Sequence, residues 1–207
     1  RVARERGAEF VITLIHWGVE YATKANAEQE RTARWLLGHG CDAVIGGHPH
    51  VVQNFTLDAN PGNDRYPEIV VYSMGNLVSN QRDVNCDGGI MIELDLRRTP
   101  NSKFITQNCR YMPYWVHRGT VDSLYQYYIV PSADAVAHPE AYQIGADDLR
   151  ALQTFDGNTR RRLEACRLPG GQNIEEAVFY RNAMRIYPPS GGVVPLRGNP
   201  NLGARMQ

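Results

Sequence analysis

The run Glu9-Phe-Val-Ile-Thr-Leu-Ile15 and the run Asp42-Ala-Val-Ile-Gly46 decide the fold of this chain. Both are short and rich in β-branched residues, which is typical of strands. The first run follows Gly7 and is mostly apolar, so we predict a strand that is buried on both faces. The second run predicts a further strand of the same sheet.

A helical pattern lies between the two predicted strands. Asn26 predicts the N-cap, and Gln29 stands three residues on, where a capping box places its partner. Gly38 and Gly40 predict the end of the helix. A strand, a helix and a second strand in close succession form a βαβ unit, so we expect the two strands to be parallel. The apolar face of the helix comprises Ala33, Leu36 and Leu37.

Downstream of this unit the pattern changes, and we expect the later strands to be antiparallel. In Gly89–Leu96, four apolar residues alternate and so share one face: Ile90, Ile92, Leu94 and Leu96. The remaining predictions are strands at Ile69–Met74, Lys103–Tyr114 and Tyr125–Val130, a loop at Asp58–Asp64, helices at Asp147–Phe155, Asn158–Arg167 and Asn173–Met184, and an irregular tail after Tyr187.

The composition is that of a globular protein and excludes several classes. Hydrophobic residues make up 43% of the 207 residues, which argues against a disordered chain. Lys and Arg number 22, as do Asp and Glu, so the formal net charge is zero. Without a basic excess, a nucleic-acid partner is not expected. The cluster Arg160–Arg162 is interpreted first as a solvated helix face and second as a contact for a polyanion.

The four cysteines do not form a metal-binding or disulfide framework. None lies in a Cys-x-x-Cys pair, so a thiolate zinc site is not expected. Cys86 and Cys109 flank two predicted strands, and a disulfide between them is one interpretation. The equal alternative is four small, buried or half-buried thiols.

Three histidines follow the two predicted parallel strands directly. His16 comes after the first strand, and His48 and His50 come after the second. The carboxyl ends of parallel strands lie at one edge of the sheet, which is where open α/β sheets bind ligands. We therefore expect three imidazoles to converge there. His39 is expected to interact with the end of its helix, and His117 and His138 are interpreted as surface residues.

The His-x-His spacing suits metal binding. In extended backbone the two side chains point to the same side, roughly 6–7 Å apart, and two metals of a dinuclear site lie about 3.5–4 Å apart. Each imidazole can therefore reach a different metal, or both can bind one. Pro49 fixes the backbone between them, and Gly46 and Gly47 allow a sharp turn close to the site.

These residues carry a resemblance to a known family. The blocks His16-Trp-Gly-Val-Glu-Tyr21, Gly47-His-Pro-His-Val-Val-Gln53 and Tyr72-Ser-Met-Gly-Asn76 are similar to three signature blocks of CapA-type poly-gamma-glutamate capsule biosynthesis proteins. That family is a branch of the calcineurin-like metallophosphoesterases. The resemblance implies an α/β (α+β) fold: a β-sandwich flanked by helices. It covers residues 1–115, interpreted as the C-terminal half of such a domain, and residues 116–207 are interpreted as a partly helical extension.

The resemblance also implies roles for individual residues. His16, His48 and His50 are implied as catalytic metal ligands, with the last two on different metals of a dinuclear centre. Glu20 is interpreted either as a partner that orients an imidazole or as a solvated acid. Ser73 and Asn76 are interpreted first as a structural turn and second as substrate contacts.

One departure from the family concerns the remaining ligands. The family supplies carboxylate and amide ligands from Gly-Asp, Asn-Leu-Glu and Asn-Asn-His motifs ahead of the His-Trp-Gly block, and this sequence contains none of them. The charged stretch Arg1–Arg6 looks like a helix already under way. We therefore predict that the missing N-terminal half of the same protein completes the site and covers half of the core.

Three functional hypotheses remain open. The first is a phosphoesterase-like hydrolase with two divalent transition metals (Mn, Fe or Zn), active only with the missing half. The second is a non-catalytic envelope component that binds an anionic capsule polymer or assists its export. The third is a mononuclear zinc site with three histidines. The resemblance also implies an extracytoplasmic place at the cell envelope, an anchor in the absent N-terminus, and capsule-synthesis membrane proteins as partners.

Overall fold

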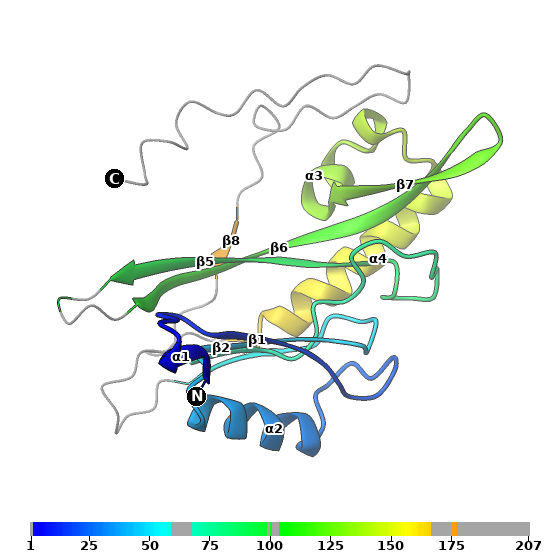
Figure 1. Cartoon of the computed structure of the whole chain (residues 1–207). Coiled ribbons are helices and arrows are strands. Elements are labelled where there is room, and N and C mark those ends of the chain that lie inside the picture. The colour runs from blue at the N-terminus through cyan, green and yellow to red at the C-terminus, as the bar shows by residue number, and fades with distance from the viewer. Residues whose placement is uncertain (1, 59–67, 99, 101–103, 167–174, 178–207) are drawn as a thin grey trace.

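The computed structural model describes residues 2–58, 68–98, 100, 104–166 and 175–177. Figure 1 shows two β-sheets stacked as layers, with the helix Ala27–Gly38 on the outer side of the first sheet. The helix Ala146–Leu163 lies against the side of the second sheet that faces the first, and its last residue, Leu163, joins the core between the sheets. This mixed architecture confirms the predicted α+β class and is consistent with part of a calcineurin-like domain. A short helix, α1 (Val2–Glu5), begins the described chain, as the charged N-terminal stretch predicts.

The first sheet contains the predicted βαβ unit. Its strands are β1 (Ile12–His16), β2 (Ala43–Gly47), β3 (Phe55–Asp58) and β4 (Glu68–Val71), in the order β1-β2-β4-β3. β1 and β2 are parallel, as expected. The expectation that all later strands are antiparallel is wrong for β4, which is parallel to β2 and antiparallel only to β3. The four-residue β3 was not predicted.

The helix of the unit, α2 (Ala27–Gly38), begins and ends where predicted. Asn26 accepts a hydrogen bond from the backbone N–H of Gln29 at 2.9 Å, and the Gln29 side chain accepts one from the Asn26 N–H at 3.1 Å. This reciprocal capping box is confirmed. Ala33 and Leu37 of α2 are buried against the outer face of the first sheet.

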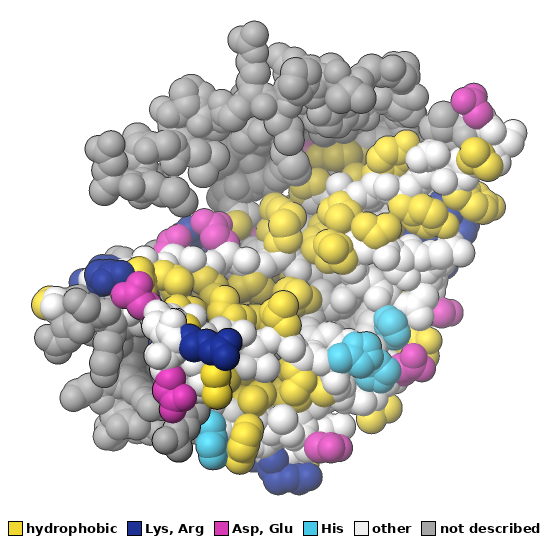
Figure 2. Space-filling view, in the orientation of Figure 1, with side chains coloured by type: hydrophobic (Ala, Val, Ile, Leu, Met, Phe, Trp, Pro, Cys, Tyr) yellow, Lys and Arg dark blue, Asp and Glu magenta, His cyan; other side chains and the backbone are white. Residues whose placement is uncertain are grey.

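Strand β1 is not buried on both faces, and that prediction is wrong. Ile12 is 48% exposed and Leu14 is 78% exposed. Both residues pair across the sheet with Ala43 and Ile45, which face the core between the two sheets. Ile12 and Leu14 therefore lie on the inward face of an edge strand that the second sheet does not cover. Figure 2 shows hydrophobic side chains gathered on this side of the molecule.

The second sheet consists of β5 (Gly88–Arg98), β6 (Phe104–Val121) and β7 (Leu124–Pro131), with the two-residue β8 (Glu175–Glu176) beside β6. The three long strands are antiparallel, as predicted, whereas the short strand β8 pairs parallel with its neighbour. Of the four residues predicted to share a face, Ile90 is buried and Ile92 and Leu94 pack against the same core. Leu96 is 40% exposed. The pairing with β6 shifts register between Asp95 and Leu96, so the predicted alternation does not continue to Leu96.

The C-terminal helices form one cluster against β6 and β7. They are α3 (Ser132–Ala137), the 3₁₀ helix η1 (Pro139–Tyr142) and α4 (Ala146–Leu163). The two predicted helices on either side of Gly157 are a single helix. The helix predicted at 173–184 is wrong at Glu175–Glu176, where the chain forms β8. The rest of that helix apart from Ala177, the body of the loop at 58–64 and the tail after Tyr187 lie outside the described residues.

The cluster Arg160–Arg162 is not simply a solvated face. Arg160 donates to Asp156 at 2.8 Å and forms a bidentate pair with Glu176 of β8. Arg162 is half-buried, and burial lowers its pKa. Only Arg161 of the three is exposed. Arg160 therefore fixes β8 to α4, and the cluster presents one cation to solvent rather than three.

No disulfide joins any of the four cysteines, all of which lie among the described residues. Cys86, Cys109 and Cys166 are buried and Cys41 is half-buried, which agrees with the interpretation as small core residues rather than with a Cys86–Cys109 disulfide. Burial raises the pKa of Cys109 to about 12. The Cys109 thiol is therefore a weak nucleophile at neutral pH.

His117 is buried, so its assignment to the surface is wrong, whereas His138 is exposed as predicted. The His117 ring stacks with the rings of Trp115 and Tyr128, with centroid distances of 5.8 and 6.3 Å. Its Nδ1 lies 3.7 Å from Asp148. Burial lowers the pKa of His117, and Asp148 opposes this only in part.

This lowered pKa predicts a pH dependence of stability. Below the ordinary value of 6.5 the unfolded chain binds a proton at His117 more readily than the folded protein does. The free energy of unfolding should therefore fall as pH drops from 6.5 towards the folded-state pKa. Urea unfolding between about pH 8 and about pH 5 measures this slope. His117→Gln should flatten it, and the exposed control His138→Gln should not. Equal slopes in His117→Gln and the unmodified chain would contradict the prediction.

Candidate metal-binding site

The ends of β1 and β2 place the histidines. The two strands pair in register from Ile12 opposite Ala43 to His16 opposite Gly47, so both end at the same edge of the sheet. The backbone N–H of Trp17 extends this pairing by one residue, because it donates to the Gly47 carbonyl at 3.1 Å. His48 and His50 follow in the turn after β2. The convergence expected from strand order is therefore present in the structure.

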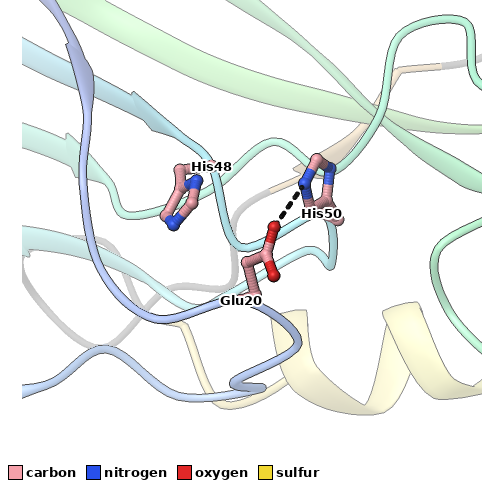
Figure 3. A group of neighbouring side chains, drawn as sticks. All are labelled: Glu20, His48 and His50. Carbon is pink, nitrogen blue, oxygen red and sulfur yellow. Dashed lines mark ion pairs between the residues drawn. The ribbon is translucent and has the colours of Figure 1, made fainter.

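The imidazoles and one carboxylate form a compact group. The rings of His16 and His48 lie 4.4 Å apart, and those of His48 and His50 lie 6.0 Å apart. Glu20 reaches this group from the loop after β1 (Figure 3), and its Oε1 lies 3.5 Å from His50 Nε2. One ligand atom each from Glu20, His48 and His50 all lie within 4.8 Å of one another. His16 contacts His48 but lies outside this set.

The backbone around the group is strained. Three non-glycine residues at the site adopt positive φ: His48 at 100°, His50 at 62° and Tyr21 at 64°. Such conformations cost energy and persist where the surrounding structure imposes them, often at functional sites. The Tyr21 N–H donates to the Pro49 carbonyl at 2.8 Å. This bond ties the loop that carries Glu20 to the turn that carries both histidines.

Gly46 allows three strand ends to approach closely. A Cβ at this position would lie 2.2 Å from the Tyr72 carbonyl oxygen and 2.3 Å from Trp17 Nε1. These two atoms form a hydrogen bond with each other, with Trp17 Nε1 donating at 2.8 Å. The indole therefore bridges the end of β1 to the segment after β4 across Gly46, and only a glycine leaves room for it.

Asn76 holds His50. Its Oδ1 lies 2.8 Å from His50 Nδ1, and its Nδ2 donates to Gln81 Oε1 and to the Cys86 carbonyl, both at 2.7 Å. Asn76 was interpreted from the sequence as a turn residue or a substrate contact, and in the structure it positions an imidazole. Ser73 is fully buried and accepts from the Gly75 N–H at 3.3 Å. Its hydroxyl thus belongs to a structural turn.

Gln53 supports the site, a role that the sequence did not predict although Gln53 ends the second block of the resemblance. It is fully buried, accepts from Gln29 Nε2 at 3.0 Å, and donates to the carbonyls of Ala22 and Lys24 at 2.7 and 3.1 Å. These bonds anchor the loop between β1 and α2, which includes Glu20. The sequence signal for its burial was its place directly after an apolar pair, Val51 and Val52.

The donor set fits a transition metal. Imidazole nitrogens with a carboxylate suit Zn²⁺, Fe²⁺ and Mn²⁺, whereas Mg²⁺ and Ca²⁺ favour all-oxygen sites. The side chains of His50 and Glu20 are 29% and 53% exposed, so the group is accessible from solvent. His39, in contrast, lies apart at the end of α2, where its Nδ1 contacts the Trp35 carbonyl at 2.6 Å.

Fold and site together define a class: part of an α+β two-sheet domain with a histidine cluster at the carboxyl edge of its parallel strands. Residues 1–81 match the family described as "Bacterial capsule synthesis protein PGA_cap". This confirms, for that part of the chain, the resemblance to CapA-type capsule biosynthesis proteins.

Two curated relatives agree with the family match. The chain is 33% identical over 95 residues to "Capsule biosynthesis protein CapA" of Bacillus anthracis, covering 45% of this chain and 21% of that protein. It is 27% identical over 100 residues to "PGA biosynthesis protein CapA" of Bacillus subtilis (strain 168), covering 48% of this chain and 24% of that protein. The matched part thus spans less than a quarter of each relative's length.

The anchoring role of Gln53 can be tested by Gln53→Leu. The buried amides of Gln29 and Gln53 and the carbonyls of Ala22 and Lys24 would lose partners or be deleted. The free energy of unfolding should therefore fall by about 1–3 kcal/mol. Urea denaturation measures this change. The matched control, Gln126→Leu on an exposed position of β7, should change it by less than about 0.5 kcal/mol. Equal effects of the two variants would contradict the anchoring role.

Proposed function

We propose that this chain is part of a capsule biosynthesis protein and contributes half of a metal-dependent, phosphoesterase-like hydrolase site. The observation that carries the proposal is the convergence of His16, His48 and His50 with Glu20 at one sheet edge. The family match over residues 1–81 and the names of both Bacillus relatives support the capsule context. Poly-gamma-glutamate is the proposed polymer.

The proposed mechanism assigns distinct tasks to the chain's own residues. His48 and His50 bind metal through ring nitrogens, and His16 extends the cluster beside His48. Asn76 holds the His50 ring in one orientation. Bound divalent metal ions would supply Lewis-acid stabilisation of charge that develops on a phosphoryl oxygen. In the complete domain we expect two such ions (Mn, Fe or Zn).

A complementary segment of the same protein is the proposed partner. The described residues bring one carboxylate to the histidines, whereas a dinuclear hydrolase site uses several, one of them bridging the metals. The exposed inward-facing residues Ile12 and Leu14 support the same proposal. They extend the inter-sheet core to an edge strand with an open pairing side, as expected where a further segment packs.

We further propose that the protein acts outside the cytoplasm at the cell envelope, with capsule-synthesis membrane proteins as partners. The capsule biosynthesis names of its relatives support this location. Among the described residues, no helix has the length and apolar character needed to cross a membrane. The competing hypothesis, a non-catalytic component that binds an anionic capsule polymer, predicts the same location but no hydrolysis.

Metal analysis and a phosphodiester assay of the protein that includes the complementary segment test the hydrolase. We expect about two transition-metal ions per chain and metal-dependent cleavage of bis(p-nitrophenyl) phosphate. The double variant His48→Ala, His50→Ala should lose both, because two nitrogen ligands are removed. The control His39→Ala removes an imidazole outside the cluster and should retain both. Metal binding without hydrolysis would favour the polymer-binding alternative.

The partner proposal predicts how the chain behaves without the complementary segment. We expect self-association in light scattering, because the inward face of β1 is uncovered. Leu14→Glu should reduce self-association, whereas Leu124→Glu should not, although Leu124 is 66% exposed at the β6–β7 turn. A folded, monodisperse monomer of the unmodified chain would contradict the proposal.

A further inference from the structure

We propose that Glu20, His48 and His50 alone form a complete binding site for one divalent transition-metal ion, with Glu20 as a direct ligand and Asn76 as the residue that positions His50. The inference rests on the proposed function in that it shares two histidines with that site. It requires neither the complementary segment nor hydrolysis. Glu20 thereby becomes an anionic ligand rather than a solvated acid or a partner that orients an imidazole.

The distances favour direct ligation by Glu20. Zn–N and Zn–O bonds are about 2.0–2.2 Å long, so two ligand atoms at a tetrahedral angle lie about 3.4 Å apart. Glu20 Oε1 and His50 Nε2 are 3.5 Å apart, at the outer limit of a hydrogen bond but at the separation of two ligands of one ion. The nearest ligand atom of His48 lies within 4.8 Å of both of these atoms. A small rotation of the His48 side chain would bring it to the separation of ligands that share one ion.

The hydrogen bonds of Asn76 determine which nitrogen of His50 is free. Because Asn76 Nδ2 donates to Gln81 and to the Cys86 carbonyl, Asn76 Oδ1 is the atom that faces His50. An amide oxygen only accepts, so His50 Nδ1 carries the hydrogen. In the neutral ring Nε2 then presents a lone pair to the Glu20 carboxylate. Two acceptors that face each other repel, and a cation between them converts the repulsion into ligation.

The loop contacts hold Glu20 and His50 at this separation. The Tyr21 N–H bonds the Pro49 carbonyl, so the residues next to each ligand are joined directly. Gln81, which fixes Asn76, also donates to the Tyr21 hydroxyl at 3.3 Å, and the Tyr21 ring lies 5.9 Å from the His50 ring. Tyr21 and His50 both adopt positive φ. The structure thus pre-orients both ligands at a cost in backbone strain.

Cobalt provides the test, because Co²⁺ bound by nitrogen and oxygen ligands absorbs visible light. We expect the chain, titrated with Co²⁺ without the complementary segment, to bind one ion with a visible absorption band. Glu20→Gln should weaken binding at least 10-fold, because a neutral amide replaces the anionic ligand. The matched control Glu28→Gln, at an exposed position of α2, should bind as the unmodified chain does.

Two further variants separate this site from the alternatives. Asn76→Ala should weaken Co²⁺ binding by about 10–100-fold while the limiting stoichiometry stays at one, because it removes the positioning bond and no ligand. In ¹⁵N NMR it should also release His50 from the Nδ1–H tautomer. His16→Ala should leave the affinity within about threefold, which a site with three histidine ligands would not allow.

Three results would overturn the inference. They are equal Co²⁺ affinity of Glu20→Gln and Glu28→Gln, loss of binding in His16→Ala, and no binding by a folded chain, with folding checked by circular dichroism. Equal affinity of the two Glu→Gln variants would not contradict the proposed hydrolase if the double variant His48→Ala, His50→Ala still abolishes metal binding and activity in the longer protein. Conversely, the inference is supported and the hydrolase contradicted if this chain binds one ion in a Glu20-dependent way and the longer protein has no phosphodiesterase activity.

Discussion

The parallel pairing of β1 with β2 is the constraint on which the rest of the structure depends. Five residue pairs in register, from Ile12–Ala43 to His16–Gly47, bring the carboxyl ends of both strands to one level. The crossover helix α2 makes this pairing possible, because parallel neighbours need a long connection. Without this parallel pairing, His16 and the turn that carries His48 and His50 would not lie at the same edge of the sheet.

Local sequence signals predicted this unit well because its determinants are local. The capping residues Asn26 and Gln29 and the glycines after α2 each act within a few residues of their own position. The direction of β4 is a different kind of property. β4 is parallel to β2 because the chain first passes through β3, which runs antiparallel to β4. β3 has only four residues, too few to show a periodic pattern in the sequence. Strand pairing across the sheet is decided by tertiary packing, which the pattern of β4 does not encode.

The same division explains what was predictable of the site. The convergence of the three histidines follows from strand order alone. The roles of Asn76 and Gln53 do not, because each depends on hydrogen bonds to residues more than 20 positions away. The burial of His117 was not predicted for a related reason. The alternation of residues along β6 does not show that the rings of Trp115 and Tyr128 pack against His117. Polar residues that support a site are therefore the hardest to find from sequence.

Charge balance gives Glu20 an importance that its exposure alone does not suggest. Three neutral imidazoles would leave both positive charges of a divalent ion uncompensated in a partly buried group. In the part of the chain that the structure describes, Glu20 is the carboxylate that shares a ligand set with His48 and His50. Its loop is anchored by Gln53 and by the Tyr21–Pro49 bond. A solvated acid needs no such support, whereas a metal ligand does, because affinity depends on how little the ligands must reorganise.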